Sequence, residues 1–460
     1  MTAFLGIDLG TTFLKGAVLD LDRPALRQVR RLPFPAPLPG LPPTRCELDP
    51  AAVLAATRQL IGELLDDAPD ATGLLLSSQM HCLVFLDANR RPVSNVLTWK
   101  DQRALEDHLR QPGRFIDVLR EQITAAELQA TGRELRVGVP LVTLPWLQTH
   151  GQLPADTWPT SLPDFVLASL CGTVPTTDPS NAAAYGLYDL DRSDWHRPLI
   201  DRLELGGLRW PAVRRFGEVV GTAEVHGRRL TCYTAIGDQQ CSLVGAGLEE
   251  GELSLNVSTG SQVSLLTRER RTGDFGGRPY PDELWLSTIV QVPAGRALAA
   301  LVGLLTEIGG ERGDPWDRIA RAVADVPSTD LQVNLAFYGG PFGDRGAIAN
   351  MGEHNLTVGH LFTAAFRNMA DNYALCAHTL APAHDWKRLV FSGGLVHRFP
   401  TLRDAVLRAL APVPGWRVCP STEDTLLGLL TLAVAYSGRA PSVRAAGRLV
   451  AGEHSSPPSG

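Results

Sequence analysis

The 460-residue chain lacks the features of several large protein classes. It has no basic excess, because its net charge is −6 and its pI about 6.0, which argues against binding to nucleic acid. No apolar run approaches the roughly 18 residues of a membrane span, so we expect no membrane association. The seven cysteines are scattered and never spaced as Cys-x-x-Cys, which argues against a disulfide framework and a zinc site. The start, MTAFLGIDLG, does not resemble a secretory signal, and we expect a cytoplasmic location.

The two commonest nucleotide-binding motifs are missing as well. No segment matches the Walker pattern Gly-x-x-x-x-Gly-Lys-Ser/Thr. The nearest approach to the dinucleotide pattern Gly-x-Gly-x-x-Gly is GAGLEEG at residues 245–251, which has one residue too many between its second and third glycines. A nucleotide would therefore have to bind through another arrangement.

The chain does contain two similar hairpin patterns. Residues 5–20 and 252–267 each show a strand, a polar residue (Asp8 or Asn256), a short run of small and hydroxyl residues, and a second strand. This weak repeat predicts two similar α/β halves that each contribute one hairpin turn to a shared cleft. The alternative is two unrelated surface hairpins.

Further segments support an α/β fold. The pattern predicts a helix from Pro50 with Asp49 as its N-cap, buried strands at 73–78 and 83–87, and a strand followed by a helix around 228–247. A strand, a Gly-Gly turn and a helix follow at 387–410, and a buried helix at 424–438. The Pro-rich segment 32–45 is predicted to be a loop or an edge strand, and the tail 453–460 to be disordered.

The hairpin turns have the composition of phosphate-binding loops. Small residues let backbone N–H groups and hydroxyls converge on phosphate oxygens. Asp8 is costly to bury inside a strand, and a divalent cation bound with phosphate would compensate it. Asp238 follows a strand, where a fixed carboxylate can accept a proton from an attacking hydroxyl. The alternatives are that Asp8 caps its own turn and that Asp238 caps the next helix.

Two segments have side chains suited to a polyol. SSQMH (77–81) combines an amide, an apolar side chain and an imidazole, and TWKDQR (98–103) adds an indole, a carboxylate and a guanidinium. Taken singly, such residues are more often part of a core or a surface.

In order along the chain, GIDLGTT, SSQMH, TWKDQR, TDPSNAAAYGLYD, GDQQCS, NVSTGS and FSGGLVHR resemble the motifs of the FGGY carbohydrate kinases. The resemblance extends from about Leu5 to Ser437. It implies two RNase H-like domains of the actin-like ATPase superfamily with a deep cleft between them. The domains would span 1–238, with the sugar site and the first phosphate hairpin, and 239–452, with the ATP site.

The resemblance also implies roles for individual residues. Asp238 would be the general base, and Asp8 and Asp238 would hold Mg²⁺. The implied sugar-binding residues are Gln79, Met80, His81, Trp99, Asp101, Arg103, Asp238 and Gln239. The implied ATP-binding residues are Gly10, Thr11, Thr12, Lys15, Thr259, Gly260, Ser261, Gly393 and Gly394, although a structural role for Lys15 is an equal alternative.

Within the family, the chain most resembles the sedoheptulokinases and next the xylulokinases. The expected activity is ATP-dependent phosphorylation of a ketose at its terminal hydroxyl, with sedoheptulose first and xylulose or ribulose next. Ser78 and Cys82 replace two glycines that flank Gln-Met-His in the family, which leaves the identity of the sugar open. The alternatives are an actin-like ATPase that acts as a chaperone or regulator, and a sugar sensor without activity. The oligomeric state stays open, with a homodimer as one option.

Overall fold

The computed structural model describes residues 2–307, 309, 313–419 and 423–454, and the chain forms two compact units. The first unit combines Met1–Gly247, Gly277–Leu284 and Glu423–Gly460, and the second combines Leu248–Gly276 and Trp285–Thr422. This grouping differs from the expected division at residue 238, because helix α8 (Asp238–Gly245) packs on α14 (Asp424–Tyr436) within the first unit. Of the expected tail, residues 453 and 454 complete α15 (Val443–His454), and 455–460 lie outside the described residues.

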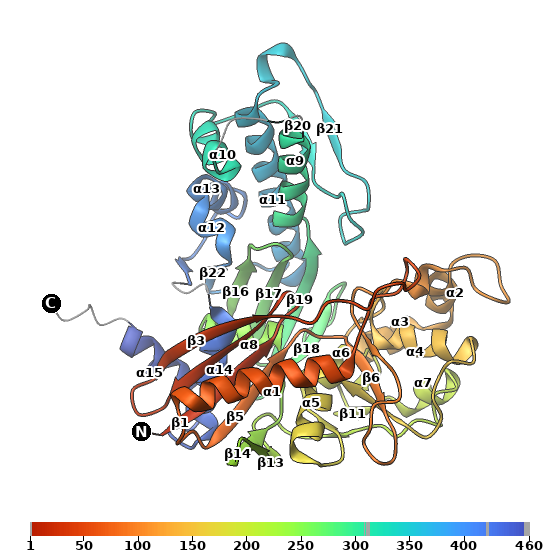
Figure 1. The fold of residues 1–460 in the computed structure, drawn as a ribbon. Coiled ribbons are helices and arrows are strands. Elements are labelled where there is room, and N and C mark those ends of the chain that lie inside the picture. The colour runs from red at the N-terminus through yellow and green to blue at the C-terminus, as the bar shows by residue number, and fades with distance from the viewer. Residues whose placement is uncertain (1, 308, 310–312, 420–422, 455–460) are drawn as a thin grey trace. The chain divides into compact units, whose positions relative to one another are not determined.

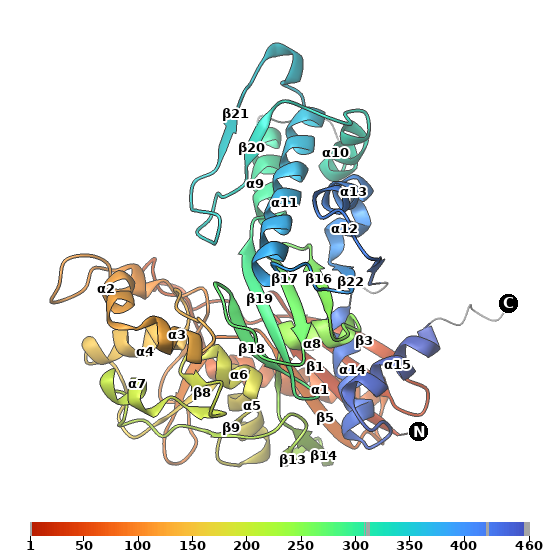
Figure 2. The same ribbon diagram turned by 180° about the vertical axis from the view of Figure 1, so that it is seen from behind.

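The first unit is built on a sheet with the strand order β13-β14-β5-β1-β2-β3, in which β15 also pairs with β5. Strands β1 and β2 form the predicted hairpin, and β1, β14 and β15 each run parallel to a neighbour. Helix α1 crosses one face of this sheet (Figure 1), and α14 lies on the opposite face (Figure 2). The strands are β1 (Ala3–Leu9), β2 (Phe13–Asp20), β3 (Ala25–Pro33), β5 (Gly73–Ser78), β13 (Val219–Val225), β14 (Arg228–Tyr233) and β15 (Ile236–Gly237). The unit also contains the helices α1 (Pro50–Asp67) and α5 (Leu162–Cys171).

The alternation along β1 explains which way Asp8 faces. Ile7 lies on the α1 side, since a Cβ on its cross-strand neighbour Gly16 would meet Ile7 together with Leu60 and Leu64 of α1. Gly6 faces α14, where an added Cβ would lie 3.2 Å from the Cβ of Leu429. Because side chains alternate along a strand, Asp8 shares the face of Gly6, toward the helices α14 and α8.

The second unit repeats the same sheet topology. Its strands run in the order β19-β17-β16-β22-β23, where the first three are antiparallel neighbours and the last three are parallel neighbours. The strands β3-β2-β1-β5-β14 of the first unit have this same sequence of directions. The predicted repeat of two α/β halves is therefore confirmed, and two unrelated hairpins are excluded.

The second unit contains the strands and the helix that the sequence predicted around the turns in segments 252–267 and 387–410. Helices α9 and α11 run side by side in both views (Figures 1 and 2). The elements are β16 (Glu252–Asn256), β17 (Ser261–Thr267), β19 (Leu284–Val292), α9 (Gly295–Thr306), α10 (Pro315–Ala324), β20 (Gln332–Asn334), β21 (Ala347–Ala349), η2 (Glu353–Asn355), α11 (Val358–Leu380), β22 (Arg388–Ser392), α12 (Gly394–Arg398), α13 (Pro400–Ala409) and β23 (Trp416–Val418).

Smaller elements surround the first sheet. A four-stranded sheet with the order β4-β7-β6-β8 supports the segment that contains Trp99. The side chain of Asp49 accepts a hydrogen bond from the N–H of Ala51, as predicted for the cap of α1. These elements are β4 (Glu47–Leu48), β6 (Leu83–Leu86), β7 (Val96–Leu97), η1 (Arg103–Leu105), α2 (Phe115–Gln122), α3 (Ala125–Ala130), α4 (Pro140–Thr149), β8 (Trp158–Ser161), β9 (Thr176–Thr177), α6 (Pro179–Ala184), β10 (Tyr188–Asp189), β11 (Asp194–Trp195), α7 (Arg197–Arg202) and β12 (Ala212–Val213). Strand β18 (Gly276–Tyr280) instead precedes β19 in the order of the six-stranded sheet, β18-β19-β17-β16-β22-β23. No helix in the described part of the chain is long and apolar enough to cross a bilayer.

Candidate active site

Three parallel strands of the first sheet end at one edge, and each end bears a predicted site residue. Ser77 of β5 lies opposite Asp8 of β1 on one side and opposite Ile236 of β15 on the other. Asp8 near the end of β1, Gln79 directly after β5 and Asp238 directly after β15 therefore meet at this edge. Ligands of α/β proteins bind preferentially at the carboxyl ends of parallel strands, so the topology marks this edge as a candidate site.

Asp8 is a buried carboxylate with an unsatisfied oxygen. Its exposure is 7%, and Oδ1 has no hydrogen-bond partner among the described residues. Burial, and then the nearby carboxylate of Asp238, raise the pKa of Asp8 to about 7. Since Oδ1 accepts nothing from the hairpin turn, the alternative role of Asp8 as a cap of its own turn is not supported.

Asp238 is the first residue of α8 and is partly exposed. Gly237 occupies the N-cap position, so the alternative role of Asp238 as N-cap is wrong. Its Oδ1 accepts a hydrogen bond of 2.8 Å from the N–H of Gln239. Burial nevertheless raises the pKa of Asp238 to about 6. A carboxylate with this pKa, open on one side, is suited to accept a proton near neutral pH.

The pair of Asp8 and Asp238 fits a magnesium ion shared with a nucleotide. Mg²⁺ in kinase sites is usually bound by one or two carboxylates together with phosphate oxygens and waters, rather than by a complete protein cage. In agreement with this, the described residues contain no cluster of three or more potential metal ligands, while Asp8 retains an unpartnered buried oxygen. Burial raises the pKa of both carboxylates, so a cation bound beside them would favour their ionised forms.

The first hairpin turn is accessible, as phosphate binding requires. Thr11 and Thr12 are exposed at its tip. A Cβ on Gly10 would lie 2.9 Å from the carbonyl oxygen of Phe13, so the tight turn requires glycine. Lys15, opposite Asp8 in the hairpin, forms an ion pair of 2.9 Å with Glu423. The ion pair with Glu423 supports the structural role that the sequence analysis gave as an alternative for Lys15.

Gln79 connects the hairpin to the predicted sugar segment. Its Oε1 accepts hydrogen bonds from Thr11 Oγ1 at 3.4 Å and from Trp99 Nε1 at 3.0 Å. Its Nε2 donates to the carbonyl oxygen of Gly10 at 3.3 Å. Trp99 remains 38% exposed, and the ammonium of Lys100 lies over its ring, 5.5 Å from the centroid. Gln79 therefore positions the hairpin and Trp99 relative to one another.

Both ring nitrogens of His81 are occupied by protein groups. Nδ1 lies 2.8 Å from the carbonyl oxygen of Ala184, and Nε2 lies 2.7 Å from Nη2 of Arg136. Burial and the Arg136 charge lower the pKa of His81 to about 3. The ring is therefore neutral, with Nδ1–H donating to Ala184 and Nε2 accepting from Arg136, so the predicted sugar contact through His81 would have to use a ring face.

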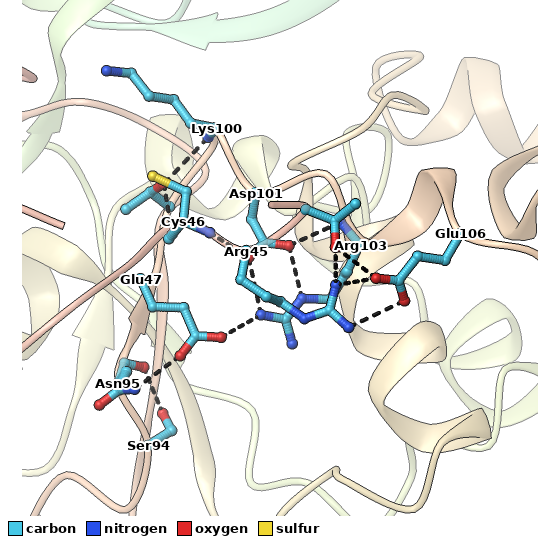
Figure 3. Close-up of polar contacts among 11 residues, drawn as sticks. Arg45, Cys46, Glu47, Ser94, Asn95, Lys100, Asp101, Arg103 and Glu106 are labelled. Atoms are coloured by element: carbon cyan, nitrogen blue, oxygen red, sulfur yellow. Dashed lines mark hydrogen bonds and ion pairs between the residues drawn. The ribbon is translucent and has the colours of Figure 1, made fainter. Parts of the chain in front are cut away.

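Asp101 and Arg103 take part in a network of hydrogen bonds and ion pairs (Figure 3). Both are almost fully buried, and Asp101 pairs with Arg103 at 2.7 Å and accepts from the N–H of Cys46 at 3.0 Å. Arg103 also pairs with Glu47 of β4 at 2.6 Å. These bonds favour a supporting role for Asp101 and Arg103, rather than the direct sugar binding that the resemblance implies.

A charged cluster that sequence reasoning missed lies beside these residues. Glu134 is 4% exposed and pairs with Arg136 at 2.9 Å and with Arg278. The two arginines hold the pKa of Glu134 at about 2 in spite of its burial. Arg278 in turn contacts Met80 and Gln239. No short motif marks the charged cluster, because Glu134 and Arg136 lie far from Arg278 along the chain.

The second unit contains the other predicted ATP-binding residues. Thr259 and Gly260 are exposed between β16 and β17, whereas Ser261 is buried and bonds to Tyr373 Oη at 2.8 Å. Gly393 has φ +90°, and a Cβ there would lie 2.5 Å from the carbonyl oxygen of Val257. The Gly393–Gly394 turn thus lies against the end of the hairpin strand β16, as close packing of backbone requires.

Comparisons with known proteins agree with this architecture. A model described as "FGGY family of carbohydrate kinases, N-terminal domain" matches residues 3–245, more than half of the chain. The chain is 24% identical to mouse sedoheptulokinase over 89% of its own length and 93% of that protein. It is 26% identical to Bacillus subtilis xylulose kinase, over 61% of the chain and 56% of that protein.

Solved structures establish the fold. A ligand-bound xylulose kinase from Lactobacillus acidophilus matches with a TM-score of 0.85 at 17% identity, over 98% of this chain and 92% of that chain. Plasmodium falciparum glycerol kinase with ADP matches with a TM-score of 0.81 at 16% identity, over 98% and 92%. The predicted class of two actin-like ATPase domains is confirmed. By its family model, its relatives and its fold, the chain belongs to the FGGY family of carbohydrate kinases and is a sugar kinase with ATP as a substrate.

Proposed function

We propose that this kinase transfers the γ-phosphoryl group of ATP to the terminal hydroxyl of a ketose, with Asp238 as the general base. The observation that carries the proposal is the position of Asp238: a partly exposed carboxylate at the end of β15, with a pKa raised to about 6. Such a group is ionised at neutral pH and still basic enough to accept a proton from a hydroxyl.

The proposed reaction follows from this placement. The hydroxyl oxygen of the sugar forms a bond to the γ-phosphorus as the bond to the β–γ bridging oxygen breaks, and Asp238 takes the hydroxyl proton. The exposed turns Gly10–Thr12 and Thr259–Gly260 are proposed to bind phosphates, and Gly393–Gly394 the adenosine. Asp8 and Asp238 would hold Mg²⁺, which when bound offsets the negative charge of the phosphates.

Sedoheptulose is the first candidate for the sugar, and xylulose or ribulose come next. Mouse and human sedoheptulokinase both match 89% of the chain and 93% of their own length. The xylulose kinase of Bacillus subtilis matches 61% of the chain. Ser78 and Cys82 are both buried around the Gln79–His81 segment, so they act on the site through packing rather than by contact with sugar.

The test measures ADP release with sedoheptulose, xylulose, ribulose, glycerol and gluconate, using the wild-type enzyme and Asp238→Asn. We expect one ketose to stimulate turnover, and Asp238→Asn to lower kcat for that sugar at least ~100-fold. Asp164→Asn is the control, because burial also raises the pKa of Asp164, to about 8, and Asp164 lies on α5 outside the site. Sugar-stimulated turnover that persists in Asp238→Asn would refute the base assignment, and stimulation by glycerol or gluconate alone would refute the ketose.

A further inference from the structure

Arg278 is a buried cation that connects three predicted parts of the sugar site. It lies on β18, and its side chain is only 4% exposed. Nη1 donates to Gln239 Oε1 at 2.5 Å and approaches Met80 Sδ at 3.3 Å, while Nη2 donates to Glu134. One rigid guanidinium thus contacts the segments after β5, before α4 and at the start of α8.

The cluster continues from Arg278 to the imidazole of His81. Glu134 accepts from Arg278 with Oε1 and from Arg136 with Oε2, and Arg136 donates to His81 Nε2. Met80, His81 and Gln239, three of the implied sugar-binding residues, are therefore held directly or indirectly by one charged network. A surface ion pair has no such connections and contributes little.

Backbone contacts also hold the segment that carries Arg278. Gly132 has φ +75°, and a Cβ there would lie 2.5 Å from the carbonyl oxygen of Gly277. The N–H of Gly277 donates to the carbonyl oxygen of Gly132 at 3.3 Å. On the other side, Gln240 Nε2 of α8 donates to the carbonyl oxygen of Pro279 at 3.4 Å. The segment that carries Arg278 is thus bonded both to the loop of Glu134 and to α8.

Met80 also lies directly against the residue that precedes Asp238. A Cβ on Gly237 would lie 2.9 Å from both Sδ and Cε of Met80. A change in the position of Met80 would therefore act on the start of α8 as well as on the predicted apolar wall for the sugar. Arg278 contacts both parts of this junction.

We propose that Arg278 is a positioning residue that sets the orientation of Met80 and Gln239 toward the sugar and so determines sugar affinity. This inference rests on the proposed function, because it needs a sugar at the site. The competing explanation is that Arg278 and Glu134 form a buried ion pair that serves the fold alone. The two explanations make different predictions for an Arg278 variant that still folds. A positioning role predicts weaker sugar binding, and a role in the fold alone predicts unchanged sugar binding.

The experiment compares Arg278→Lys, Arg278→Met and the double variant Glu134→Gln/Arg278→Met. Lysine keeps the charge but cannot bridge three partners, and the double variant also removes the buried carboxylate that Arg278→Met would leave with Arg136 as its remaining ion-pair partner. We expect every variant that folds to raise the KM for the sugar, and its Kd measured by calorimetry without ATP, by at least ~10-fold. The KM for ATP should stay within ~3-fold of the wild-type value, because the hydrogen bonds seen for Arg278 in the described part of the chain go to Met80, Gln239 and Glu134 and not to the predicted ATP-binding residues.

Arg192→Met is the matched control, since Arg192 is 76% exposed and lies 3.8 Å from its partner Asp189. It should leave both KM values unchanged. A sugar Kd and KM within ~2-fold of wild type in a folded Arg278 variant would overturn the inference, even if that variant melts at a lower temperature. If instead no sugar binds to or stimulates the wild-type enzyme, the proposed function itself fails.

Discussion

At the residue scale, the fold holds Asp8 where its ionised form is disfavoured in the protein alone. Burial and the Asp238 carboxylate raise the pKa of Asp8 to about 7, against an ordinary value near 3.8. The folded state therefore binds a proton there more tightly than the unfolded chain does. The corresponding contribution to stability is present at low pH and is lost as the pH rises through 7.

Asp8→Asn should therefore stabilise the protein while removing its activity. Asparagine resembles the neutral acid, so the gain in the free energy of unfolding should be absent below pH ~4 and reach at most about 4 kcal/mol above pH ~7. Denaturant titrations at pH 4 and pH 8, without nucleotide or metal, measure this difference. Activity with Mg²⁺-ATP and sugar should fall at least ~100-fold.

Asp164→Asn provides the comparison for Asp8→Asn. Burial raises the pKa of Asp164 to about 8, so its substitution should also stabilise the protein at high pH, yet leave activity intact. An Asp8→Asn variant that is less stable than wild type at pH 8, or that retains activity, would contradict the account of Asp8.

His81 gives a second prediction at this scale. Because burial and Arg136 lower its pKa to about 3, the imidazole should stay neutral throughout the pH range of activity. Imidazole NMR signals of His81, assigned with a His81→Gln variant, should not titrate between pH 5 and 9 in the folded protein. In the urea-unfolded protein the same signals should titrate near the ordinary value of about 6.5. A folded-state midpoint above pH 5 would show that Arg136 does not occupy Nε2.

At the scale of elements, the ion pairs of Arg103 join the two strands that support the Trp99 segment. Arg103 pairs with Glu47 on β4 and with Asp101, which follows β7 (Figure 3). Both strands have only two residues, so backbone pairing alone holds them weakly. The charged side chains add ion pairs that join the segment to β4.

Arg103→Met should destabilise the protein by about 3–5 kcal/mol, because it leaves two acidic side chains beneath this segment without their cation. Thermal unfolding measures the loss. Arg120→Met, which removes an exposed ion pair with Asp117, should cost less than about 1 kcal/mol. Equal effects of the two substitutions would mean that the Arg103 pairs are not structural.

Local sequence signals predicted most elements around the site. The cap at Asp49, the strand patterns and the Gly-Thr-Thr turn each depend on neighbouring residues, and the structure contains all of them. The burial of Asp101 with Arg103 and the full occupation of His81 were not predictable, because they depend on partners far along the chain. Glu134 and Arg278 are separated by 144 residues and match no local pattern.

At the scale of the whole molecule, the two sheets share one topology but differ in the polar side chains beside their hairpin turns. The first hairpin ends beside the buried carboxylate of Asp8 and the partly exposed carboxylate of Asp238. The second has Asn256 at the place of Asp8, as the alignment of the two hairpin patterns predicted. The repeat could be predicted from sequence because strand and turn composition is local, whereas the assignment of residues 277–284 and 423–454 to the first unit could not.

The discontinuity of the first unit has a consequence for synthesis on the ribosome. Its last helices, α14 and α15, are translated after the entire second unit. At translation rates of about 5–20 residues per second, Gly247 precedes Glu423 by roughly 10–35 s. During this interval the face of β1 that carries Gly6 and Asp8 lacks its α14 cover, so the first unit cannot complete its packing until the last part of the chain has been made.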